Sequence, residues 1–198
     1  MSKTYVFADW ILEMLKLHAF WMLYTLKGGI ILGIFPSTAA AYGVIRTWKM
    51  EGNVISVGNH FKKFHKENFK ASNILGWLLT VSTAAAVLNF SMIPHFNEIT
   101  RLIMYTVVIC VAVIVVIEWL YLFPILVHYS LSIANYFVVN MRVGLTSFSA
   151  IIMQFLIIGI YGLLIYIAPA LFLVFGIIPI AFVQIAISNN VLNKMQVS

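Results

Sequence analysis

Long apolar stretches alternate with short polar segments along the chain, and their lengths predict helices that cross a membrane. A helix needs about 20 residues to cross the hydrocarbon core of a bilayer. The last apolar stretch, 151–187, has no charged residue and is long enough for two helices. Pro169 divides it, because proline removes a helix hydrogen bond and disfavours helix in the residue before it. The pattern predicts one all-α membrane domain with five transmembrane helices, at 20–45, 74–94, 102–127, 151–168 and 170–187.

Residues 4–18 show a different, amphipathic pattern. Apolar side chains recur on one helical face and charged side chains on the other, which predicts a helix that lies at the membrane interface and leads into the first span. The apolar face consists of Phe7, Trp10, Ile11, Met14 and Leu15. A cleaved signal peptide ending near 39–41 is the alternative, but the acidic residues Asp9 and Glu13 disfavour it.

Composition supports the membrane assignment and changes the meaning of the net charge. The chain of 198 residues is 63% hydrophobic and 9% charged, whereas soluble domains carry about 25% charged residues. In a membrane protein, lysine and arginine mainly report the side on which a loop lies. We therefore do not take the net charge of +6 as a sign of nucleic-acid binding.

The distribution of Lys and Arg predicts the orientation. With five spans, the loop 46–73, the segment 128–150 and the C-terminal tail share one side and hold eight of these residues. The other side holds three, namely Lys3, Lys16 and Arg101. The excess predicts that the C-terminus is cytoplasmic and the N-terminus outside.

The main cytoplasmic element predicted is the basic segment N-H-F-K-K-F-H-K-E-N-F-K at 59–70. Its phenylalanines fall near one helical face and its lysines cover much of the rest, which predicts a short basic amphipathic helix. One interpretation places it on anionic lipid headgroups, and the other makes it a docking helix for another protein. The residues concerned are Phe61, Lys62, Lys63, Phe64, Lys66, Phe69 and Lys70.

Small residues recur every four positions in the first predicted span. Gly29, Gly33, Ser37 and Ala41 would form one face of a helix, kinked midway by Pro36. Such a face allows another helix backbone to approach closely. We interpret it as a packing or partner interface, with the lining of a substrate path as the alternative.

Two segments in the first third of the chain resemble a known family. G-I-F-P-S-T-A-A-A-Y-G-V-I-R-T-W at 33–48 and F-K-K-F-H-K-E-N-F-K-A-S-N-I-L-G at 61–76 are similar to the YesL-like family of small bacterial membrane proteins. The resemblance implies a multi-pass plasma membrane protein, frequently encoded beside carbohydrate ABC importers and polysaccharide-degrading enzymes. It implies no agreed catalytic residues, so no site is carried over from the family.

Lys27 and Glu118 are the two charges inside predicted spans. A charge at mid-bilayer costs about 2.5–3.5 kcal/mol on insertion scales, so such residues are functional candidates. We hypothesise that the two form an ion pair between the first and third spans. The alternative is that Lys27 extends to the interface and Glu118 bonds to polar neighbours.

The sequence favours a non-catalytic function. It has no recognisable zinc, phosphate-binding or nucleophile motif, so we expect no catalytic residue, metal or cofactor. The hypothesis is an accessory subunit of an oligosaccharide-uptake ABC importer, with membrane lipids and the permease subunits as partners and no nucleic acid. The alternatives are a homo-oligomeric transporter or channel, and an intramembrane enzyme centred on Glu118.

Overall fold

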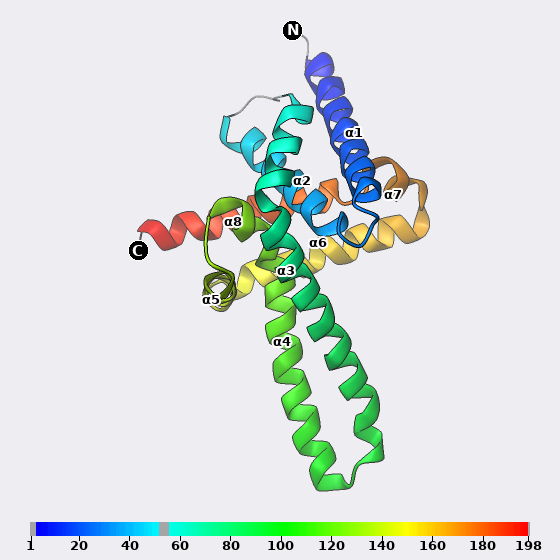
Figure 1. Cartoon of the computed structure of the whole chain (residues 1–198), viewed down its shortest axis with the longest axis vertical. Helices are drawn as coiled ribbons and strands as arrows, with labels where there is room; N and C mark the ends of the chain where they lie inside the picture. Colours follow the sequence, from blue (N-terminus) through cyan, green and yellow to red (C-terminus); the bar gives the residue numbers. More distant parts are fainter. Residues whose placement is uncertain (1–2, 52–55, 198) are drawn as a thin grey trace.

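The computed structural model describes residues 3–51 and 56–197, and these residues contain helices and connections but no strand. The all-α fold predicted from the sequence is confirmed. Figure 1 shows a compact group of helices from which one long helical hairpin extends. The helices are α1 (Lys3–Lys27), α2 (Ile34–Glu51), α3 (Val57–Met92), the 3₁₀ turn η1 (Ile93–His95), α4 (Glu98–His128), α5 (Ile133–Thr146), α6 (Phe148–Ile167), α7 (Ala170–Phe175) and α8 (Ile178–Val197).

Three segments are long and apolar enough to cross a bilayer. They are Val57–His95, Glu98–His128 and Phe148–Ile167, and they contain or closely match the spans expected at 74–94, 102–127 and 151–168. Most of the large apolar side chains on the outer half of the α3–α4 hairpin are exposed, including Val87, Leu102 and Ile103. The protein is therefore a multi-pass helical membrane protein.

The first expected span, 20–45, is wrong as a single helix. The chain turns at 28–33 and returns as α2, antiparallel to α1 (Figure 1). Contacts between the helices follow this antiparallel register: Trp10 and Trp48 rings lie 5.8 Å apart, and Trp21 Nε1 donates to Thr38 Oγ1 at 3.0 Å.

Glycine makes this turn possible. Gly29 has φ +65°, and a Cβ on Gly33 would lie 2.9 Å from Thr25 Cα and overlap its carbonyl oxygen. Pro36 does not kink a helix midway, because it lies in the first turn of α2, where its missing N–H is not needed. The expectation that Gly29, Gly33, Ser37 and Ala41 share one helix face is therefore also wrong.

Ser37 and Ala41 are nevertheless buried, whereas Gly29 is exposed. The buried face of α2 packs against α3, α4 and α8. Phe35 of α2 lies so close to Gly76 of α3 that a Cβ on this glycine would overlap the phenylalanine ring. The small residues of α2 thus serve packing inside the chain.

The fifth expected span, 170–187, is also interrupted. α7 ends at Phe175, Gly176 follows with φ +52°, and α8 begins at Ile178. A Cβ on Gly176 would overlap the His18 ring of α1, so this break lets α7 dock on α1. Pro179 lies in the first turn of α8, as Pro36 does in α2.

The amphipathic segment 4–18 is the first part of α1, not a separate helix. The side chains of residues 4–8, Phe7 among them, lie outside the described residues. Beyond them the apolar face packs on the core, since the Trp10 ring also lies 5.7 Å from Phe182 of α8. Asp9 and Lys16 are exposed on the opposite face.

Candidate functional site

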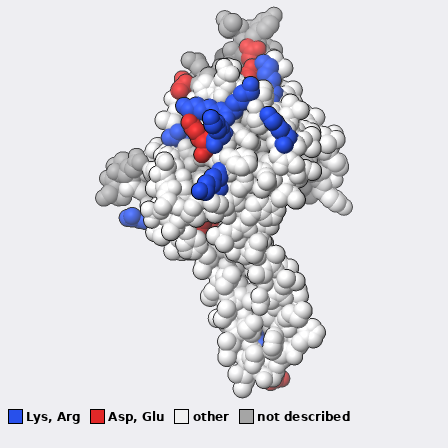
Figure 2. Space-filling view, viewed as in Figure 1, with Lys and Arg blue, Asp and Glu red and all other residues white. Residues whose placement is uncertain are grey.

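The basic segment forms the beginning of α3, which continues without a break into the second apolar segment. A helix of 36 residues is about 54 Å long, so α3 extends well beyond the roughly 30 Å hydrocarbon core. The lysine side chains of this part are exposed, and Figure 2 shows basic side chains gathered at the end of the molecule away from the hairpin tip. We call this surface the basic face; its residues are Lys62, Lys63, Lys66 and Lys70.

The three phenylalanines of the segment do not share one environment, contrary to the expected amphipathic face. Phe61 is fully buried, with its ring 5.2 Å from Tyr24 and 5.8 Å from Phe20. Phe64 is half-buried against Gly43, and Phe69 is 40% exposed. Phe61 is therefore a core residue and cannot contact a partner or the membrane.

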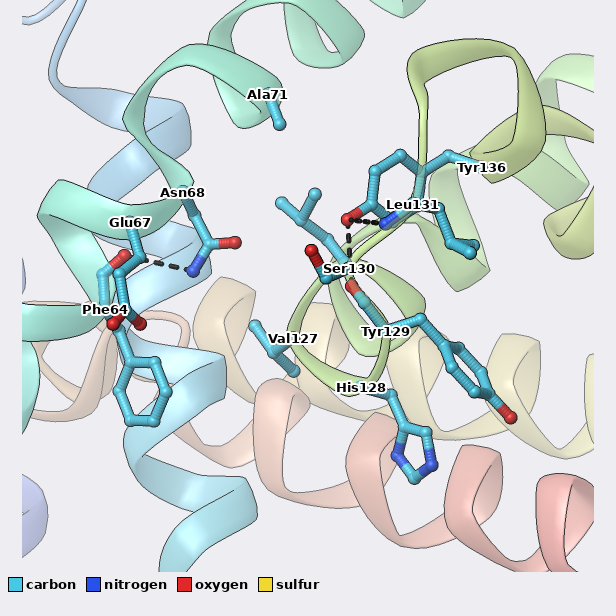
Figure 3. Close-up of a pocket in the computed structure, with 11 residues that line it drawn as sticks. Phe64, Glu67, Asn68, Ala71, Val127, His128, Tyr129, Ser130, Leu131 and Tyr136 are labelled. Atoms are coloured by element: carbon cyan, nitrogen blue, oxygen red, sulfur yellow. Dashed lines mark hydrogen bonds between the residues drawn. The ribbon is translucent and has the colours of Figure 1, made fainter.

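A pocket of about 470 Å³ lies beside the basic face, between α3 and the connection from α4 to α5. Figure 3 shows Glu67 and Asn68 of α3 on one side and Ser130 with Leu131 on the other. The polar groups that line it are hydroxyl, amide and imidazole groups, and Glu67 adds one exposed carboxylate. We call this the α3–α5 pocket; its lining is Phe64, Glu67, Asn68, Ala71, Leu126, Val127, His128, Tyr129, Ser130, Leu131 and Tyr136.

Tyr136 holds the α4–α5 wall of this pocket in place. Its hydroxyl donates to the Tyr129 carbonyl oxygen at 2.8 Å and accepts from the Leu131 backbone N–H at 3.2 Å. Ser132 caps α5, since its hydroxyl accepts from the backbone N–H of Asn135 at 3.4 Å. The wall is therefore preorganised, not a loose loop.

Arg46 connects α2 to the same wall. Its Nε donates to Nδ1 of His128 at 3.2 Å, so this histidine nitrogen accepts and carries no proton. Burial lowers the pKa of the Arg46 guanidinium, an effect partly opposed by Tyr129 nearby. The pocket is thus lined by α3, α4, α5 and the connection between α4 and α5, and α2 supports it through Arg46.

The hypothesised ion pair between Lys27 and Glu118 is not present. Lys27 is exposed at the end of α1, with Nζ 5.6 Å from the centre of the Tyr24 ring. Glu118 is buried and accepts from Asn140 Nδ2 of α5 at 2.8 Å. The two charges are separated because α1 turns back at 28–33 and does not run beside α4 as a full span.

Sequence reasoning missed the buried polar side chains that join the helices. Tyr42 of α2 donates to Gln184 of α8, and Gln154 of α6 lies beside Tyr121 of α4. Gln154 and Gln184 stand out as polar residues in the charge-free stretch 151–187. That signal marks them as candidates, although it does not identify their partners.

Comparison with known proteins supports the family resemblance. Residues 14–90 match a family model described as "Protein of unknown function, DUF624". The uncharacterized protein YesL of Bacillus subtilis (strain 168) is 30% identical over 127 residues, which are 64% of this chain and 59% of YesL. The chain is therefore similar to the YesL-like proteins, as its two segments at 33–48 and 61–76 predict.

Two further relatives come from the same organism. The uncharacterized protein YesV is 29% identical over 138 residues, 68% of this chain and 65% of YesV. The uncharacterized protein YteU is 26% identical over 129 residues, 65% of this chain and 58% of YteU. The chain therefore matches less than two thirds of the length of each YesL-like relative, and no solved structure matches it.

Proposed function

We propose that the protein is a non-catalytic accessory subunit of the bacterial plasma membrane that binds the permease of an oligosaccharide-uptake ABC importer. The observation that carries the proposal is the basic face beside the preorganised α3–α5 pocket, at the end of an apolar hairpin. A lysine-rich face favours an acidic partner surface, and the pocket can receive a polar side chain from it. The genomic association implied by the YesL-like resemblance points to carbohydrate importers.

The same surface determines the orientation that we propose. Positive charge near spans favours the cytoplasmic side, so we place the basic face in the cytoplasm and the hairpin tip outside. The sequence predicted an outside N-terminus on the assumption that residues 20–45 form one uninterrupted span, which the structure does not have. Because α1 begins at the same end of the molecule as α3 (Figure 1), we place the beginning of α1 in the cytoplasm as well.

The test is an affinity pull-down from native membranes in mild detergent, read by mass spectrometry. We expect wild type to recover ABC permease subunits and the double variant Lys62→Glu, Lys66→Glu to lose them at unchanged expression. Arg101→Glu, at the start of α4, is the matched control and should retain them. Recovery of the chain without any permease subunit from wild-type membranes would reject the accessory function. Gly33→Leu is unsuitable here, because it would disrupt the α1–α2 turn.

A homo-oligomeric transporter is the second candidate, and the buried polar side chains of α5, α6 and α8 favour it. Asn140, Gln154 and Ser188 are each at most 1% exposed. Polar residues inside a membrane bundle often mark a solute pathway. Solute flux into liposomes that contain this protein alone would support this function, and absence of flux over a broad panel would count against it.

A further inference from the structure

Glu118 and Asn140 form one hydrogen bond with each other, and each has one side-chain oxygen without a hydrogen-bond partner among the described residues. Asn140 Nδ2 donates to Glu118 Oε2 at 2.8 Å. Glu118 Oε1 and Asn140 Oδ1 are both buried and have no hydrogen-bond partner among the described residues. Both atoms are acceptors when Glu118 is ionised. Each unpaired buried acceptor carries a desolvation cost. A single hydrogen-bond donor or cation between the two oxygens would remove this cost.

In the part of the chain that the structure describes, Glu118 forms no ion pair that would compensate an ionised carboxylate. Among the described residues the structure has one salt bridge, between Lys16 and Glu13. Glu118 is 3% exposed, and an isolated ionised carboxylate in such surroundings is far more costly than a neutral one. The side chain that contacts it is that of Asn140 from α5, which carries no charge.

We propose that Glu118 and Asn140 form a proton-binding site, in which one bound proton closes an acid–amide pair. The proton comes from bulk water and attaches to Oε1 of the carboxylate, and no other reactant is consumed. Protonated Glu118 then donates to Asn140 Oδ1 while Asn140 Nδ2 still donates to Oε2. One proton therefore satisfies both orphaned oxygens and removes the buried charge.

The site joins α4 to α5 where the two helices approach closely. One turn further along α5, a Cβ on Gly144 would overlap the Ile117 side chain. The second hydrogen bond would therefore add to the packing that already holds α4 against α5. The inference does not depend on the proposed accessory function, because it concerns a site inside the chain.

Infrared spectroscopy of the purified full chain in lipid nanodiscs tests the site directly. The other acidic residues differ from Glu118 in their surroundings, since four are exposed and Glu13 is paired with Lys16. They are Asp9, Glu13, Glu51, Glu67 and Glu98. We expect wild type to show a protonated carboxyl C=O band that shifts in D₂O. The band should be lost in Glu118→Gln and kept in the control Glu67→Gln.

Thermal unfolding separates the proton from the alternative occupant, a monovalent cation. Gln at 118 can make both hydrogen bonds to Asn140, so Glu118→Gln should unfold at the wild-type temperature while Glu118→Ala unfolds earlier. Replacing sodium and potassium by choline should change neither wild type nor Glu118→Gln. A missing carboxyl band in wild type, a band that persists in Glu118→Gln, or a cation-dependent unfolding temperature lost in Glu118→Gln would each overturn the proposal.

Discussion

The backbones of Thr25 and Gly33 are in contact across the turn between α1 and α2. Because of this contact, the segment that looks like one transmembrane span in the sequence forms a helical hairpin. Gly33 has no room for a side chain, because its Cβ would lie 2.9 Å from Thr25 Cα. The antiparallel contacts between Trp10 and Trp48, at the far ends of the two helices, depend on this turn. The turn therefore determines where α2, and with it much of the core, is placed.

The first prediction concerns this turn. Gly33→Leu should destabilise the protein by about 1–3 kcal/mol or more, because the added atoms overlap backbone that cannot shift without opening the turn. Gly159 offers a matched control in α6, since a Cβ there meets nothing within 4 Å. Thermal unfolding in detergent should show a lower unfolding temperature for Gly33→Leu than for Gly159→Leu. Equal unfolding temperatures would contradict the hairpin.

The second prediction concerns the close approach of α4 and α5. A Cβ at Gly144 would overlap the Cγ2 methyl of Ile117. Gly144→Ala should therefore lower stability by about 1–3 kcal/mol, measured by unfolding in detergent. Ile117→Ala in the same chain should recover part of this loss, because it removes the colliding atoms. If the double variant loses as much stability as the two single variants added together, the side chain at position 144 does not collide with Ile117.

The third prediction separates two phenylalanines that look equivalent in the sequence. Phe61→Ala should cost about 3–5 kcal/mol, as expected for a fully buried aromatic ring. Phe69→Ala should cost much less, since this side chain is 40% exposed. The measurement is the yield of folded protein and its unfolding temperature in detergent. A larger cost for Phe69 would mean that α3 is rotated relative to the structure.

The apolar stretches could be located from the sequence because membrane insertion depends on length and hydrophobicity, which are local. The turn at 28–33 could not, because glycine is common inside transmembrane helices and signals a turn only when another backbone packs against it. Pro36 was ambiguous for a similar reason, since it is compatible with a kink or with the first turn of a helix. In both cases tertiary packing decided between two locally acceptable structures.

The buried polar pairs were beyond sequence reasoning for a different reason. Tyr42 and Gln184 are 142 positions apart, and Glu118 and Asn140 belong to different helices. A polar side chain in an apolar environment needs a hydrogen-bond partner, and the sequence shows this need for each of these residues. The choice of partner follows from the fold, which is why Lys27 was an attractive but incorrect partner for Glu118.

The last prediction tests whether the α3–α4 hairpin crosses the membrane with the basic face inside. From Lys66 to Met92 the helix rises by about 39 Å, more than the hydrocarbon thickness of roughly 30 Å. In a Cys110→Ser background, Asn97→Cys at the hairpin tip should react with a membrane-impermeant thiol reagent on intact cells. Lys66→Cys should react only after permeabilisation.

Ile103→Cys is the control for lipid exposure and should stay unreactive in both conditions, because its side chain is 57% exposed but lies on the apolar hairpin. Labelling of positions 66 and 97 from the same side would show that the hairpin does not cross, and labelling of position 66 on intact cells alone would reverse the orientation.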